Sequence, residues 1–339
     1  MSKKVLEVKN LQTSFFTHLG EVQAVRDISF ELNEGDILGI VGESGSGKSV
    51  TSLSIMRLID QPGIIKEGSS INFDGVELTE LSKKEMEDYR GNEIAMIFQD
   101  PMTSLNPVYT IKNQMMEVIR RHTDMSKAEA FDRAKDLLKM VGIPDPDSQI
   151  HDYPHQFSGG MRQRALIATA ISCNPKLLIA DEPTTALDVT IQAQILELLK
   201  ELQKETKMSI ILITHDLGVI AEVSTHVIVM YGGMIMEKGT VSDVFYNPQH
   251  PYTKGLHKSI PKATKKTKER LVPIEGSPPD LMNPPTGCPF SPRCDHAMEV
   301  CLKKPAPLFQ ITDTQTSACW LNHPESPVVE GFTKTKEVV

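Results

Sequence analysis

The sequence predicts an α/β fold built around a mainly parallel sheet, and three observations lead to this prediction. Short, continuous apolar runs at residues 37–41, 177–180 and 209–214 have the length and composition of buried parallel strands. Segments with helical periodicity alternate with these runs, and a glycine-rich loop joins the first run to a helix. Strands that alternate with helices indicate a layered core with helices packed on a parallel sheet.

The N-terminal part is expected to form an antiparallel β subdomain. Residues 5–8 and 24–32 have the composition of strands, and a turn-forming segment around Leu19 and Gly20 joins them. A second turn at 33–36 precedes the first buried strand, and the residues after the glycine-rich loop, 48–59, are predicted to form a helix.

A helical insert at about residues 102–172 interrupts the alternation of strands and helices. Residues 110–142 carry apolar side chains at helical spacing. The apolar set consists of Met115, Val118, Ile119, Leu137, Leu138 and Val141. Further helices are predicted at 158–173 and 191–205. We assign residues 1–255 to the main domain.

A change in composition after Tyr252 marks a loop-rich C-terminal extension at 256–339. Five basic residues fall within the nine positions 262–270, and prolines and cysteines dominate from Pro273 onward. Four of the five cysteines lie within the last 52 residues. In a reducing compartment such clustering points to a metal centre more than to disulfides.

Composition and charge narrow the class of protein. Apolar residues make up 40% and charged residues 24% of the chain, which is ordinary for a globular protein. No apolar run approaches the ~20 residues of a membrane-spanning helix, and the N-terminus leads into a strand without an apolar secretory region. We therefore expect a cytosolic chain that reaches a membrane only through a partner. The net charge of −8 argues against a general nucleic-acid binder.

Residues 42–49 match the phosphate-loop pattern G-x-x-x-x-G-K-[ST] between a predicted strand and a predicted helix, the context that this motif requires. Glycines permit turns that aim backbone N–H groups at phosphates, and a helix N-terminus favours anions. Lys48 is predicted to reach the β and γ phosphates of ATP, and the Ser49 hydroxyl to bind Mg²⁺. The other predicted nucleotide contacts are Gly42, Ser44, Gly45, Ser46 and Gly47.

The apolar run at 177–180 ends in two acids, which supply the second half of a nucleotide-hydrolysing site. Asp181 is predicted to hold Mg²⁺ through water, and Glu182 to orient and deprotonate the attacking water. Two acids at a strand end are often only a solvated turn. The phosphate loop upstream favours the catalytic interpretation.

The segment FSGGMRQR at 157–164, which begins 24 residues before Asp181, resembles the signature of the ABC transporter ATPases. Met161 replaces the usual glutamine, as in the peptide-importer branch of that family. The resemblance implies an ABC-type ATPase in which Ser158, Gly159 and Gly160 contact ATP held by a partner subunit's phosphate loop. A glycine-containing turn before an amphipathic helix is the simpler interpretation, and it leaves the other matches unexplained.

Three further residues match the family in the expected order. Gln99 resembles the glutamine that contacts Mg²⁺ and water and moves with the transmembrane partner. Asp188, in the sequence Ala-Leu-Asp, resembles the loop that crosses the dimer interface. His215 follows the run at 209–214 and resembles the switch histidine that contacts the γ-phosphate. The resemblance therefore implies catalytic roles for Gln99 and His215 beside the acid at 182.

An aromatic residue near the N-terminus stacks on adenine in this family. Phe15 fits the spacing best, and Phe16 is the alternative. One of two adjacent phenylalanines in a strand is expected to belong to the core, so the choice between them stays open.

Residues 274–294 resemble the C-terminal module of oligopeptide and dipeptide importer ATPases. This resemblance implies peptide uptake, with nickel uptake as the related alternative. Four thiolates could hold a [4Fe–4S] cluster or a structural Zn²⁺, or remain free thiols. The spacing lacks the paired C-x₂-C of many zinc sites, and the resemblance favours the cluster, in a structural role. The four cysteines are Cys288, Cys294, Cys301 and Cys319.

The resemblance also implies the partners and the location of the chain. It implies a second ATPase subunit, related but distinct, two transmembrane permease subunits, and an extracytoplasmic peptide-binding protein that acts indirectly. The chain would then work at the cytoplasmic face of the membrane as a peripheral subunit, without a nucleic-acid partner. Two rivals are a non-transport ABC ATPase, such as a translation or DNA-repair factor, and a regulatory module that binds ATP without hydrolysis. One cassette with all its catalytic residues disfavours both.

Overall fold

The computed structural model describes residues 3–99, 104–185, 187–259 and 273–339. The chain forms two compact units. The first contains residues 1–6, 31–37 and 72–213, and the second contains residues 7–30, 38–71 and 214–339. Parallel and antiparallel strands occur together with helices, which confirms the predicted α/β class.

An antiparallel sheet forms from the N-terminal part of the chain. Its order is β2-β1-β5-β6, and β4 pairs with β1 so that Phe15 lies opposite Gly63. The strands are β1 (Lys4–Thr17), β2 (Gly20–Asn33), β4 (Gly63–Ile65), β5 (Ser70–Phe73) and β6 (Val76–Glu77). The first two strands are much longer than predicted because they contain polar residues in buried positions. Thr13, for example, is buried with its hydroxyl 2.8 Å from that of Ser54.

Three parallel strands form the sheet of the first unit. They are β7 (Ile94–Ile97), β8 (Leu177–Asp181) and β9 (Ser209–Thr214). Leu177 lies opposite Ile94 on one side and Ser209 on the other. Every residue of β8 and β9 is buried, which explains their continuous apolar sequence. The predicted strands at 177–180 and 209–214 are confirmed, the first with one additional residue.

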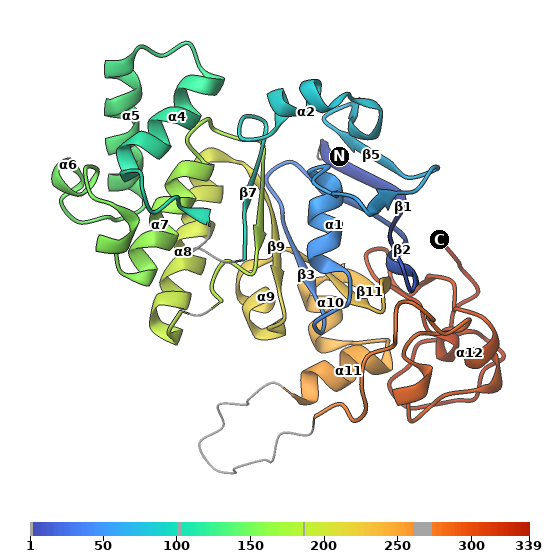
Figure 1. Cartoon of the computed structure of the whole chain (residues 1–339). Helices are drawn as coiled ribbons and strands as arrows, with labels where there is room; N and C mark the ends of the chain where they lie inside the picture. The colour runs from blue at the N-terminus through green and yellow to red at the C-terminus, as the bar shows by residue number, and fades with distance from the viewer. Residues whose placement is uncertain (1–2, 100–103, 186, 260–272) are drawn as a thin grey trace, which may run out of the picture. The chain divides into compact units, whose positions relative to one another are not determined.

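Helices make up most of the rest of the first unit (Figure 1). The green helices α4, α5 and α6 in Figure 1 lie together, and α7 packs on α4 and α5. The helices are α2 (Lys83–Tyr89), α4 (Ile111–His122), α5 (Lys127–Met140), α6 (Pro146–Gln149), α7 (Gly159–Ala170) and α8 (Val189–Thr206), with 3₁₀ turns η1 (Leu78–Glu80) and η2 (Pro154–Gln156).

The predicted helical stretch at 110–142 consists of two helices, because Ser126 begins a new one. Its side chain accepts a hydrogen bond from the N–H of Glu129, whose carboxylate accepts in return from the N–H of Ser126. This capping box satisfies backbone donors at the start of α5. One stripe of α5 is buried. It consists of Ala130 and the residues four, seven and eight positions after it, which matches the predicted helical periodicity.

In the second unit, β3 (Ile37–Val41) pairs in parallel with β10 (His226–Tyr231). β10 is antiparallel to β11 (Met234–Thr240), and the C-terminal extension adds β13 (Thr316–Ser317) and then β12 (Phe309–Gln310) beside β11. The extension is therefore continuous with this sheet and is loop-rich, as the sequence predicts.

Short helices complete the second unit, and α1 follows the phosphate loop as predicted. α1 ends at Ile55, four residues before the predicted end, because Arg57 adopts a positive φ of 49°. The helices are α1 (Lys48–Ile55), α9 (Leu217–Val223), α10 (Val241–Tyr246), α11 (Pro251–Lys258) and α12 (Glu299–Lys303), with 3₁₀ turns η3 (Ser291–Arg293) and η4 (Trp320–Asn322).

A buried carboxylate joins β11 to the extension. Glu237 accepts hydrogen bonds from the backbone N–H groups of Gln249 and His250, at 2.7 and 2.9 Å, and from Nε2 of Gln315 at 2.8 Å. Burial raises the pKa of Glu237 to about 7. Because a buried carboxyl group requires partners, this network fixes the start of α11 and the segment before β13 against β11.

Candidate functional site

The phosphate loop, residues 42–49, joins β3 to α1 in the second unit. Two of its glycines have no room for a side chain. A Cβ on Gly42 would lie 2.1 Å from the carbonyl oxygen of Met230, and one on Gly47, where φ is +99°, would lie 2.5 Å from that of Ala24. Ser44 and Gly45 are exposed, whereas Ser46 is buried. The close packing of this loop therefore requires glycine at both positions.

Lys48 lies folded over its own loop and is only 6% exposed. Its Nζ donates to the carbonyl oxygens of Gly42 and Glu43, at 2.7 and 3.0 Å, and to Oγ of Ser46 at 3.4 Å. Ser49, the next residue, is half-buried at the start of α1. A buried ammonium at a helix N-terminus gives the loop a strong positive potential.

The second group of predicted residues lies at the end of β8, in the first unit. Asp181 is buried, and Glu182 leaves the strand with a positive φ of 47°. Oε2 of Glu182 accepts hydrogen bonds from Nε2 of Gln99 at 3.0 Å and from Oγ1 of Thr185 at 2.9 Å. The structure therefore brings together Gln99 and Glu182, two of the residues predicted to act in catalysis. A non-glycine residue at positive φ is strained, a feature that clusters at functional sites.

Thr185 was missed by the sequence analysis. Its hydroxyl orients the Glu182 carboxylate together with the Gln99 amide. The signal available in the sequence was a threonine three residues after Glu182. In the structure these residues form a turn in which the N–H of Thr185 donates to the Glu182 carbonyl. Such a turn places a hydroxyl next to the acid.

Ser158, Gly159 and Gly160 form the N-terminus of α7. Ser158 is exposed, and its Oγ accepts from the N–H of Met161 at 3.3 Å, so this residue caps the helix. A Cβ on Gly160 would lie 2.9 Å from Cγ2 of Ile191. The glycines thus permit close packing against the segment that begins α8, and the exposed hydroxyl stands at a helix N-terminus that favours anions.

Asp188 lies directly before α8, and His215 lies directly after β9. Asp188 caps α8, since its Oδ1 accepts from the N–H groups of Thr190 and Ile191 at 3.1 and 3.0 Å. Its side chain therefore orders the helix in addition to any role at an interface. His215 directly follows β9 and is exposed. Ala186, the first residue of the Ala-Leu-Asp motif that ends at Asp188, lies outside the described residues.

The two phenylalanines of β1 have different surroundings. Phe15 is half-buried beside Gly63, where a Cβ would lie 2.7 Å from Cε1 of its ring. Phe16 is 48% exposed. The adenine contact assigned to Phe15 stays a prediction. Phe16, the alternative adenine contact, is the more exposed of the two side chains.

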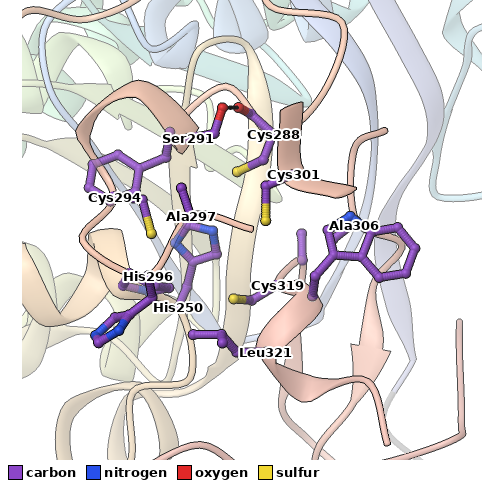
Figure 2. Close-up of a pocket in the computed structure, with 14 residues that line it drawn as sticks. His250, Cys288, Ser291, Cys294, His296, Ala297, Cys301, Ala306, Cys319 and Leu321 are labelled. Atoms are coloured by element: carbon purple, nitrogen blue, oxygen red, sulfur yellow. Dashed lines mark hydrogen bonds between the residues drawn. The ribbon is translucent and has the colours of Figure 1, made fainter. Parts of the chain in front are cut away.

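The four cysteines of the extension line one small cavity of about 20 Å³ in the second unit. In Figure 2, the sulfur atoms of Cys288, Cys294, Cys301 and Cys319 lie around this space, together with His250 and His296. Burial raises the pKa of the Cys288 thiol to about 11 and also raises the pKa values of the Cys294 and Cys319 thiols. None of these four cysteines forms a disulfide.

The thiols share a cavity, but their arrangement does not fit a metal centre as it stands. Among the described residues, no group of three or more His, Cys, Asp or Glu side chains is arranged to hold a metal ion. A backbone hydrogen bond joins two of the lining segments, since the Cys288 N–H donates to the Cys301 carbonyl at 2.8 Å. The expected cluster and its zinc alternative therefore require the side chains to rearrange.

The helices in the described part of the chain include none that is long and apolar enough to cross a membrane.

Comparison with known proteins identifies related chains. A family model described as "ABC transporter" matches residues 25–185, and one described as "Oligopeptide/dipeptide transporter, C-terminal region" matches residues 236–301. The oligopeptide transport ATP-binding protein OppD of Bacillus subtilis is 56% identical over 96% of this chain and 91% of its own length. The dipeptide transport ATP-binding protein DppD of the same organism is 53% identical over 98% and 99%, respectively.

Solved structures extend the comparison to the fold. The dimeric, post-hydrolysis structure of the ATP-binding cassette MJ0796 with ADP and Pi is similar, with a TM-score of 0.63 and 27% identity. The match covers 70% of this chain and 98% of that one. A similar cassette fold therefore accounts for most of the chain.

Proposed function

Because this chain belongs to the ABC transporter ATPases of the oligopeptide and dipeptide transport family, we propose that it hydrolyses ATP to power uptake of peptides across the cytoplasmic membrane. The main support for this proposal is the similarity to OppD and DppD along almost the whole chain, including the C-terminal region. The ATPase residues are all present, which favours a working enzyme over a regulatory module. Nickel uptake is the alternative within the same family.

The proposed site uses the chain's own side chains in distinct roles. Lys48 and the loop N–H groups bind the β and γ phosphates, and Glu182, oriented by Gln99 and Thr185, takes the proton of the attacking water. His215 contacts the γ-phosphate. The loop contacts Gly42, Ser44, Gly45, Ser46 and Gly47 complete the phosphate site.

Magnesium fits the donors that the proposal assigns to it. The Ser49 hydroxyl, the Gln99 amide oxygen and the Asp181 carboxylate are oxygen ligands of the kind that Mg²⁺ prefers. Gln99 uses its amide nitrogen to contact Glu182, so its amide oxygen is the atom suited to a cation. Bound Mg²⁺ would neutralise charge on the β and γ phosphates.

A second cassette completes the proposed ATP site. Ser158, Gly159 and Gly160 would close over ATP on the partner subunit, and Asp188 would lie at the interface. The similar cassette MJ0796 is described as dimeric. We propose a related but distinct ATPase as the partner in this case, as the peptide-importer resemblance implies.

The permease subunits are proposed to contact the segment after β7. Three large apolar side chains are exposed there, namely Phe98 at 43%, Val108 at 70% and Tyr109 at 52%. A contiguous exposed apolar patch marks an interaction surface, and these three side chains are proposed to belong to one. Docking at this segment places the chain at the cytoplasmic face of the membrane as a peripheral subunit, and the extracytoplasmic peptide-binding protein acts through the permease.

A [4Fe–4S] cluster on Cys288, Cys294, Cys301 and Cys319 is a further proposal. Its support is that four cysteines, none of them in a disulfide, line one cavity. Anaerobically purified protein is expected to be brown, with iron and sulfide at about four each per chain, and to lose both in the Cys301→Ser variant. Cys173→Ser, which removes the remaining cysteine, is the matched control and keeps the colour. Colourless protein with one zinc per chain, or with no metal, contradicts the cluster.

Uptake by cells tests the transport proposal. Cells that lack the chain are expected to lose uptake of labelled di- to pentapeptides and to regain it with the wild-type chain, while uptake of ⁶³Ni²⁺ stays unchanged. Loss of nickel uptake with normal peptide uptake would instead establish the nickel alternative. A wild-type level of both, with an active purified ATPase, would point to a non-transport role.

A further inference from the structure

We propose that Arg293, in the C-terminal extension, is a positioning residue of the phosphate loop that neutralises Glu43 and holds it in place. Glu43 is the second residue of the loop and brings a negative charge to a site for phosphates. The inference rests on the proposed ATPase function and extends it, because it assigns part of the extension to ATP binding.

The guanidinium of Arg293 makes a two-pronged contact with Glu43. Nη1 lies 2.7 Å from Oε2 of Glu43, and Nη2 lies 3.2 Å from Oε1. The Arg293 side chain is 6% exposed and that of Glu43 25%, so the pair is largely shielded from water. Parallel contacts of this kind are stronger and more directional than a single ion pair. They connect residues that are 250 positions apart in the sequence.

The remaining donors of Arg293 are also in use. Nε donates to the carbonyl oxygen of Glu275 at 2.8 Å, and Nη2 donates to that of Ile274 at 2.9 Å. Nη1 donates to the Tyr231 hydroxyl at 3.0 Å. These contacts account for all five N–H donors of a guanidinium. Because these contacts fix the orientation of the guanidinium, the guanidinium in turn fixes the position of the Glu43 carboxylate.

A second contact fixes the backbone of Glu43. Its N–H donates to the Tyr252 hydroxyl at 2.8 Å. Tyr252 is buried, and its ring centroid lies 4.6 Å from that of Tyr231 and 5.3 Å from that of Phe290. Tyr231 belongs to β10, Tyr252 to α11, and Phe290 to the segment between Cys288 and Cys294. Other parts of the second unit therefore hold both the backbone and the side chain of Glu43 in the phosphate loop.

The electrostatic consequence concerns the charge of ATP. With Arg293 present, the Glu43 pair has no net charge beside the phosphate loop. Without the guanidinium, an unpaired carboxylate on the loop repels the phosphates, and because the pair is shielded this repulsion is only weakly screened. Arg293 thus acts on ATP affinity through Glu43, without touching the nucleotide.

Equilibrium binding of ATP to the full-length chain tests the inference. Arg293→Gln is expected to raise the ATP Kd about tenfold, and Glu43→Gln in the same chain is expected to restore it to within about threefold of wild type. Glu43→Gln by itself leaves an unpaired cation beside the loop, so it is expected to tighten ATP binding, and more so at low salt. The effects are expected to be smaller for ADP, which carries less charge, and kcat at saturating ATP is expected to change less than KM.

The controls separate charge from general damage. Arg121→Gln removes an arginine from the exposed ion pair with Glu87 and is expected to leave the Kd unchanged. An unaltered Kd in Arg293→Gln, or a double variant that binds no better than Arg293→Gln, overturns the inference. If Arg293→Gln does not fold, Glu43→Gln decides, since weaker ATP binding in that variant overturns the inference as well. Wild-type protein that binds no ATP would instead refute the proposed function.

Discussion

Replacing Glu182 by glutamine is expected to lower ATP turnover by about 10²- to 10⁴-fold, the usual contribution of a general base, while ATP binding is retained. The amide cannot take a proton from water, but its oxygen can still accept from Gln99 and Thr185, which both contact a single oxygen of Glu182. The shape of the site should therefore persist. Phosphate release and the equilibrium Kd for ATP measure the two effects separately, and the ATP-bound variant is expected to accumulate as a closed dimer.

A matched variant tests whether the loss is specific to this acid. Glu201→Gln makes the same change at an exposed position of α8 and is expected to turn over ATP normally. Wild-type turnover in Glu182→Gln would remove this residue from the role of base. Loss of ATP binding together with turnover would show that the change disturbs the site's structure instead.

Buried parallel strands were the most predictable part of the fold. The runs at 37–41 and 209–214 match β3 and β9 residue for residue, because strands covered on both faces need an unbroken apolar sequence. β1 and β2 were only partly predicted, since Thr13 and Ser14 are polar and yet buried. α1 was overpredicted, because nothing in the local pattern indicates the positive φ of Arg57.

The candidate site divides in a similar way. The phosphate loop and the two acids at the end of β8 are local motifs, so spacing along the sequence is enough to predict them. Tyr252 and Arg293 could not, because their contacts with Glu43 join positions 209 and 250 residues apart, and no sequence pattern encodes such a contact. The cysteines were expected in one cluster and do line one cavity, whereas their side-chain arrangement depends on packing that spacing does not reveal.

Lys48→Met is expected to weaken ATP binding by about 10- to 150-fold and to abolish measurable hydrolysis. Charge-assisted hydrogen bonds to phosphate are worth about 1.5–3 kcal/mol, which corresponds to that range of Kd. Methionine keeps most of the length and apolar volume of the stem, so the buried position remains filled, but Gly42 and Glu43 lose the ammonium that contacts their carbonyl oxygens. Calorimetric titration with ATP and a phosphate-release assay measure the two losses.

A control for the charge change comes from a lysine of the other unit. Lys176 forms ion pairs with Asp74 and Glu93, and Lys176→Met removes the same charge from a half-exposed site. That variant is expected to lose some stability and to bind ATP as the wild type does. Equal weakening in both lysine variants would mean that the chain's overall charge sets ATP affinity. Weakening confined to Lys48→Met assigns the effect to the buried ammonium of the phosphate loop, which lies at the start of α1, where a helix N-terminus favours anions.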